Sequence, residues 1–205
     1  MIARRLPQRI VFEGKTYRIK LYFPRVLRLF EMMRDDEIPD MVKLREAVGL
    51  LAGARAKLLP TDKQARLYKE IFDQFIVTNT GTDESIPRAL DFSFDAPYIY
   101  AAFLQAYQIN LTKQRKLDWR LFMALLRALP EGTKMREIIS VRTRPIPTPT
   151  KYNADEILNL QRAKATFAIP LTDAEAAEQF QRGLDRMVDR ITALAKAGEA
   201  SGKKG

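Results

Sequence analysis

The chain has 205 residues and a formal net charge of +10, and 46% of its residues are hydrophobic, enough to bury a core in one domain with an appendage or in two small domains. Cysteine and histidine are both absent, which excludes disulfides, thiol nucleophiles, thiolate metal sites and imidazole bases. Catalysis by carboxylates, Lys, Ser or Tyr and a magnesium site remain open, but we expect a binding or assembly protein of the cell interior, with no catalytic residues, no cofactor and no metal site.

Basic residues are concentrated at the start of the chain, where residues 1–30 hold eight Lys or Arg against Glu13 alone. One interpretation is a surface for nucleic acid or another acidic partner. We favour the other, a solvated face, because nucleic-acid binders usually interleave exposed aromatic residues and the aromatic residues here have core spacing. No stretch approaches the ~18 apolar residues of a membrane helix, and no apolar run follows the basic start, so neither a membrane span nor a secretory signal is expected.

Residues 9–21 predict a β-hairpin. Every second residue from Tyr17 to Leu21 is apolar, which is the period of a half-buried strand. Glu13 and Gly14 supply the turn, because glycine tolerates a positive φ. Two strands alone are marginally stable, so the hairpin must pack on helices.

Three helices are expected next. Pro24 begins the first and the acidic residues 35–37 end it; those acids could hold a hard cation, but clustered acids at a helix end are more often solvated. Asp40 is expected to cap the second helix, and Thr61 with Gln64 matches a capping box for the third. Apolar spacings of three and four predict the buried faces: Leu27, Phe30 and Met33, then Met41, Leu44, Val48 and Leu51, then Tyr68, Phe72 and Phe75.

Residues 78–92 are polar and turn-rich, and a second group of helices is expected beyond them. Asp95 is expected to cap a helix whose aromatic residues could stack bases but whose helical spacing favours core packing. Asp118 is expected to cap a helix over 119–129 that is apolar around most of its circumference and therefore central. Thr133 begins a short helix. The predicted buried residues are Ile99, Phe103, Ala106, Tyr107, Trp119 and Phe122.

The clearest boundary lies at residues 143–150, where alternate prolines favour an extended chain. We therefore expect a mainly α fold: a helical domain over 1–142 with a short N-terminal β-hairpin, a Pro-rich linker over 143–150, and a C-terminal helical arm over 151–205 with a frayed tail. Helices are expected near 155–165 and from Thr172 onward.

The last predicted helix carries a seam with the three-four rhythm of a coiled coil. An exposed seam would bind a partner helix, whereas an ordinary amphipathic helix would fold back on its own domain, and the sequence leaves both open. The candidate partner-binding residues are Phe180, Leu184, Met187, Ile191 and Leu194.

The central segment resembles a known family. Three motifs are similar in order and spacing to those of the tail assembly chaperones of long-tailed phages, the Gp-fifteen type. They are an Asp–aromatic–Ile–aromatic stretch followed by Ala-Phe in residues 95–111, a Trp-x-x-Phe helix in residues 117–129, and an Ile-Ile-x-x-Arg ending in residues 133–142. The resemblance covers roughly residues 8–145.

The resemblance implies a protein without catalytic residues that binds the hydrophobic tape measure protein in the host cytoplasm. Such a chaperone keeps that protein soluble while tail tube subunits polymerise around it, and it is generally absent from the finished virion. It implies the tape measure protein as partner, with the tail tube protein or a second copy of the chain as further candidates. A nucleic-acid-binding protein and a structural tail or head-completion protein are the alternatives.

Replacing Leu184 and Ile191 together with Lys separates the two interpretations of the seam. If the seam binds a helix, self-association or partner binding is lost while the melting temperature changes little, because the domain core is untouched. A large drop in melting temperature with partner binding intact would place the seam in the core.

Overall fold

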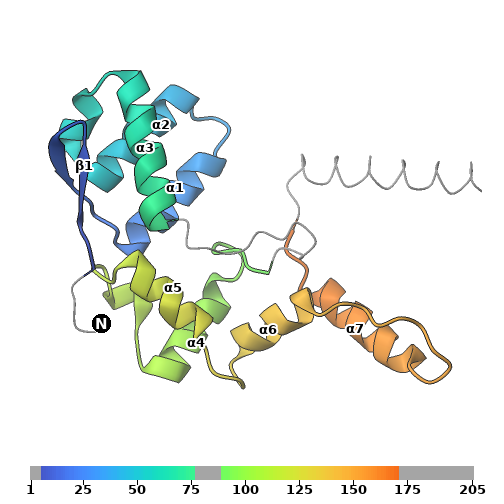
Figure 1. Cartoon of the computed structure of the whole chain (residues 1–205). Helices are drawn as coiled ribbons and strands as arrows, with labels where there is room; N and C mark the ends of the chain where they lie inside the picture. The colour runs from blue at the N-terminus through green and yellow to red at the C-terminus, as the bar shows by residue number, and fades with distance from the viewer. Residues whose placement is uncertain (1–5, 77–88, 171–205) are drawn as a thin grey trace, which may run out of the picture. The chain divides into compact units, whose positions relative to one another are not determined.

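A computed structural model describes residues 6–76 and 89–170 (Figure 1). These residues are mainly α-helical with one N-terminal antiparallel hairpin, as predicted. A first compact unit ends at Phe167, and a second begins at Ala168. The elements are β1 (Arg9–Phe12), β2 (Lys15–Arg18), α1 (Phe23–Arg34), α2 (Asp40–Ala52), the 3-10 helix η1 (Ala54–Leu58), α3 (Thr61–Ile71), the π-helical turn η2 (Phe72–Ile76), α4 (Ala96–Tyr107), the 3-10 turn η3 (Leu111–Lys113), α5 (Trp119–Arg127), α6 (Lys134–Thr143) and α7 (Ala154–Thr166).

The hairpin closes through the predicted turn. Phe12 pairs with Lys15, and the two residues between them have positive φ angles, 47° for Glu13 and 74° for Gly14. Two successive left-handed residues match the right-handed twist of the strands, which is why this short loop forms a hairpin. Ile10 and Phe12 are buried, so one face of β1 belongs to the core.

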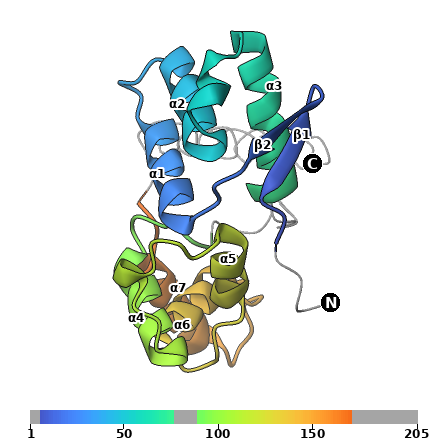
Figure 2. The same cartoon turned by 90° about the vertical axis from the view of Figure 1, so that its left-hand side faces the viewer.

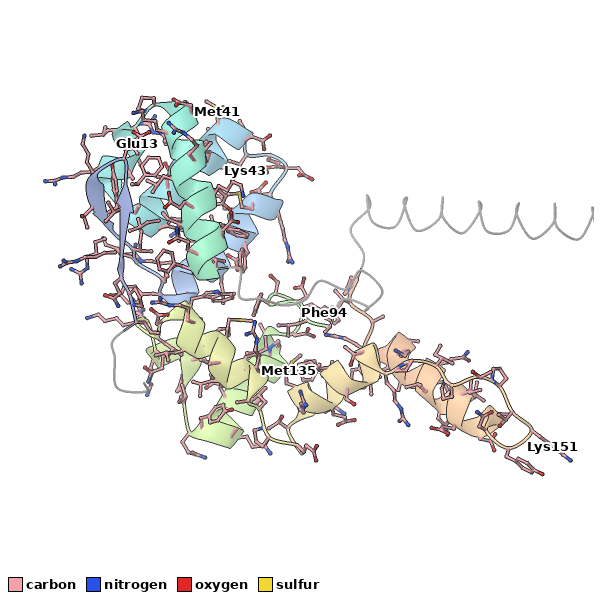
Figure 3. All side chains as sticks on the ribbon, viewed as in Figure 1. Glu13, Met41, Lys43, Phe94, Met135 and Lys151 are labelled. Atoms are coloured by element: carbon pink, nitrogen blue, oxygen red, sulfur yellow. The ribbon has the colours of Figure 1, made fainter. Side chains whose placement is uncertain are left out.

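Glu13 attaches the hairpin tip to α3 (Figures 2 and 3). Its carboxylate accepts hydrogen bonds from Lys63 Nζ at 2.6 Å and from Arg66 Nη2 at 2.9 Å. The hydrogen bond from Lys63 lowers the pKa of the Glu13 carboxyl below its ordinary value. These exposed ion pairs add to the support that the two-stranded sheet gains by burying Ile10 and Phe12.

The most buried face of α1 lies one position away from the predicted stripe. Val26 and Leu29 are fully buried, whereas Leu27, Phe30 and Met33 are half-buried at the edge of the core. Residue i and residue i+1 are about 100° apart on a helix, so this shift turns part of the predicted inner stripe toward the surface.

The predicted capping box at the start of α3 does not form. Pro60 occupies the N-cap position, and the buried Gln64 side chain donates to the carbonyl oxygens of Lys57 at 3.1 Å and Leu59 at 2.7 Å. Gln64 therefore satisfies backbone acceptors of the preceding turn instead of the donors of its own helix.

The start of α2 also differs from the prediction. Pro39, not Asp40, holds the N-cap position, and the Asp40 side chain is fully exposed. Met41 shares the helical face of the buried Val48 but is 60% exposed, so its predicted burial is wrong (Figure 3). The periodicity gives the correct angle around the helix, but the first three residues of α2 are exposed and burial begins at Lys43.

Two short segments, 21–23 and 117–119, pair side by side and connect α1 to α5. The Phe23 amide donates to the Leu117 carbonyl at 2.9 Å, and the Trp119 amide donates to the Leu21 carbonyl at 2.6 Å. Asp118 caps α5 as predicted, since its Oδ1 accepts from the Arg120 amide at 2.9 Å. These bonds set the relative position of the two helix starts.

Trp119 and Phe122 are buried, as predicted, in an aromatic cluster. Phe122 stacks on Phe23 and Phe103, with ring centroids 4.9 and 5.1 Å apart. The predicted burial of α5 on most of its circumference is wrong, however, because Leu121 on its outer side is 48% exposed. Arg120, Ala124 and Arg127 follow one another at helical spacing on the side away from Phe122, so α5 is amphipathic.

The Pro-rich stretch 143–150 does not end the compact unit, which continues through α7 to Phe167. The chain returns after the prolines, and the end of α7 bonds to the end of α6. Arg142 Nε donates to the Phe167 carbonyl at 2.6 Å, and Lys164 Nζ donates to the Arg142 carbonyl at 2.8 Å. These hydrogen bonds keep α7 with α6, where composition indicated a linker.

Trp119→Ala is expected to destabilise the protein by about 3–5 kcal/mol, as large core truncations do. Trp119 is 3% exposed, and its ring contacts those of Phe30 and Phe92 at centroid distances of 5.6 and 5.4 Å. The control is Leu121→Ala on the outer side of the same helix, for which about 0.5 kcal/mol or less is expected. Urea denaturation measures both, and equal losses would show that the cluster is not the core.

Candidate binding groove

An open apolar cavity of about 260 Å³ lies beside the aromatic cluster. Phe23 of α1 and Phe122 of α5 are buried residues in its lining, and Leu27 and Tyr100 are half-buried ones. Leu111 and Thr112 of η3 complete one end. Aromatic residues of the core therefore line a cavity that is open to the surface.

A second cavity of about 30 Å³ continues the first along α1. The two share Leu27 and Phe92, and the second adds Phe30, Glu31 and Arg34. Together the cavities follow α1 from its first residue to its last, and we call them the α1–α4 groove. At 1.5 Å per residue, the 12 residues of α1 span about 18 Å, or roughly three helical turns.

The α4 side of the groove has no charged residue. In a chain with 29% charged residues, none occurs from Ala96 to Thr112. On the side of α4 that carries Ala96, Ala96 is exposed, Tyr100 is half-buried and Leu104 is 40% exposed. Exposed helix faces usually carry charges, so an uncharged face beside an apolar groove is typical of a surface that another molecule covers.

The two ends of the groove differ in charge. At the α1 C-terminal end, Arg34 pairs with the buried Asp91 at 3.0 Å. At the η3 end, Lys113, Arg115 and Lys116 are all exposed, and none forms an ion pair with another described residue. The exposed Glu31 also lines the α1 C-terminal end, so the groove has one cationic end and one end that keeps a carboxylate.

A buried ion pair holds the N-terminus of α4. Asp95 and Arg142 are 0% and 5% exposed, and the two form a bidentate contact, Nη1 to Oδ2 at 2.6 Å and Nη2 to Oδ1 at 2.8 Å. Asp95 occupies the N-cap position as predicted, but its carboxylate makes no capping bond to α4. Its Oδ2 accepts from the Asp91 amide at 2.9 Å instead, so the carboxylate holds the segment that leads into α4.

Arg142 makes two further hydrogen bonds to backbone carbonyls. Nη1 donates to the Ala89 carbonyl at 3.2 Å and Nε to the Phe167 carbonyl. All three nitrogens of the buried Arg142 guanidinium donate hydrogen bonds, and these bonds connect α4, α6, residue 89 and the end of α7.

The lining of the larger cavity is suited to an apolar ligand. The larger cavity has no charged side chain in its lining, and its polar side chains are the hydroxyl-bearing Tyr100 and Thr112. No group of three or more acidic residues that could hold a metal gathers in residues 6–76 or 89–170. Over the same ranges, no helix is long and apolar enough to cross a membrane. An apolar surface is therefore the ligand that this site suits best.

The predicted aromatic residues of α4 divide between core and groove. Phe103 is fully buried, and Tyr107 donates its hydroxyl to the Leu125 carbonyl at 2.9 Å, so both pack in the core. Tyr100 instead lines the groove. The predicted seam, Phe180, Leu184, Met187, Ile191 and Leu194, lies outside the described residues.

Sequence reasoning did not find the groove, although two patterns pointed to it. The charge-free run from Ala96 to Thr112 is visible in the sequence, and so is the apolar pair Phe23 and Leu27 one turn apart on α1. The sequence cannot show that the two patterns face each other, because residues 23 and 96 are joined only by tertiary packing.

Residues 2–169 match the family model described as Bacteriophage Gp15 protein. The chain belongs to the bacteriophage Gp15 protein family. No significant match was found among curated proteins or among solved structures. The Gp15 match extends beyond the residues 8–145 that carry the resemblance, and its end at residue 169 lies close to the end of the compact unit at Phe167. The Pro-rich stretch and α7 therefore belong to the Gp15 domain.

Arg142→Ala is expected to cost about 3–5 kcal/mol, because it leaves the Asp95 carboxylate buried without its partner. The matched control is Arg144→Ala, two residues along, which breaks the pair with Glu156 at 3.1 Å where both side chains are more than half exposed. About 1 kcal/mol or less is expected there. Thermal and urea unfolding measure both, and a loss for Arg142→Ala no larger than the control's would show that the ion pair does not hold α4.

Proposed function

We propose that this Gp15 family protein is a phage tail assembly chaperone. It binds the tape measure protein in the host cytoplasm, keeps it soluble while tail tube subunits assemble around it, and is absent from the mature virion. The observation that carries the proposal is the open apolar groove beside the uncharged face of α4. The larger of its two cavities has no charged residue in its lining, and the protein belongs to a phage family.

The physical basis is the shielding of apolar surface. A tape measure protein is a long helical chain, and its exposed apolar stripes would self-associate. A small protein with an apolar groove covers such a stripe by helix-in-groove binding, and several copies cover a long chain. The absence of histidine and cysteine agrees with a binding protein and not an enzyme.

The second candidate is a nucleic-acid-binding protein, favoured by the basic N-terminal segment. Arg9, Lys15 and Arg18 of the hairpin are exposed. Lys63 and Arg66 pair with Glu13 nearby, so part of the positive charge there is already neutralised within the protein. A binding mode dominated by these cations would depend steeply on salt, since counterions are released from the nucleic acid.

Co-expression with the tape measure protein of the same phage tests the proposal. The tape measure protein is expected in the soluble fraction only when this protein is present, and the two are expected to copurify. Raising salt from about 50 to 200 mM should weaken the complex several-fold at most, whereas nucleic-acid binding would fall by about 10³ or more.

The control is the hairpin triple variant Arg9→Glu, Lys15→Glu, Arg18→Glu, which should keep tape measure binding. If the wild type binds nucleic acid with a steep salt dependence and the hairpin triple variant loses that binding, the nucleic-acid function would be favoured. Detection of this protein in purified virions would favour a structural tail or head-completion role.

A further inference from the structure

We infer that the α1–α4 groove binds an amphipathic helix of about three turns, oriented with an acidic C-terminal end at the Lys113, Arg115 and Lys116 side of the groove. The inference rests on the proposed function, since it names the kind of segment that a partner would present. It concerns this one surface and leaves any contact made elsewhere on the chain open.

The length of the occupant follows from α1. The groove follows α1 from Phe23 to Arg34, a span of roughly three helical turns. A helix lying along α1 would place three apolar side chains, spaced by three or four residues, into the lining. A strand would present only alternate side chains and leave its backbone groups unpaired against an apolar surface.

The orientation follows from charge. At the α1 C-terminal end Arg34 and Asp91 neutralise each other, and the exposed Glu31 of the lining leaves that end with a carboxylate, which disfavours an acidic helix end there. The exposed cations after Thr112 favour carboxylates and also the negative end of a helix dipole, which is the C-terminus. Both effects act in the same direction and select one of the two ways in which a helix could lie.

Ala96 offers a precise site for a test. It lines the groove, is exposed, and is the first residue of α4, where a carboxylate is favourable to the helix. Ala96→Glu therefore keeps the fold and places a negative charge in an apolar site. Ala101→Glu is the matched control, with the same charge change on an exposed alanine of the same helix outside the lining.

Trp119 supplies the readout. It is the only tryptophan in the chain, and its ring lies 5.4 Å from that of Phe92, which lines both cavities. A ligand that packs on Phe92 changes the surroundings of the indole and hence its emission. The probes are two tryptophan-free helical peptides of the same composition, one with Glu residues at the C-terminal end and one with them at the N-terminal end.

The full-length protein is expected to bind the C-terminally acidic peptide about tenfold more tightly than the reversed one, since charge complementarity sets orientation. Ala96→Glu should weaken that binding about tenfold or more, and Ala101→Glu about twofold at most. The preference for the C-terminally acidic peptide should be abolished or inverted in the triple variant Lys113→Glu, Arg115→Glu, Lys116→Glu. The hairpin triple variant should keep this preference. Unchanged melting temperatures establish that each variant is folded.

Equal affinity for the two peptides, or equal effects of Ala96→Glu and Ala101→Glu, would overturn the inference. If the wild type is a dimer and Ala96→Glu is a monomer, the groove binds a second copy of the chain and the inference is also overturned. The same holds if the double variant Leu184→Lys, Ile191→Lys binds the peptide more tightly than the wild type, because the chain's own seam would then occupy the groove. If the tape measure protein binds wild type and Ala96→Glu equally, the groove assignment fails and the chaperone function stands. If the peptides behave as expected but the tape measure protein does not bind, the function fails and the groove stands.

Discussion

The ring of Phe122 stacks on those of Phe23 and Phe103, and this contact joins α5 to α1 and α4. Rings of this size bury the largest apolar area available to a helical core, and their stacked geometry sets both the distance and the angle between the helices. The backbone bonds between segments 21–23 and 117–119 act beside it and hold the two helix starts in register.

The same rings form part of the groove lining, so stability and recognition share residues in this protein. Phe23 and Phe122 are buried on their core side and still contribute to an open cavity. Truncating them would remove the fold together with the binding surface. The residues that can report on binding alone are therefore at the rim, where Ala96 and the cations after Thr112 contribute little to the core.

Arg142 places a second constraint on the groove. Through Asp95 it holds the start of α4, and through the carbonyls of Ala89 and Phe167 it holds two segments that are distant in sequence. A buried guanidinium is costly unless every donor is satisfied, so its burial requires all of these partners to be in place together. The end of α7 is in this way coupled to the helix that forms one side of the groove.

The sequence by itself determined the helices, the hairpin with its Glu13-Gly14 turn, the Asp118 cap and the burial of Trp119 and Phe122, because these depend on local periodicity, turn chemistry and side-chain size. It also carried the family resemblance. Only the tertiary structure decided that Gln64 bonds to the preceding turn, that Asp95 pairs with Arg142, and that Leu27 and Ala96 line one groove. Those outcomes depend on which residues meet across the fold, and a helical period specifies the angle of a side chain around its own axis but not the element that it will face.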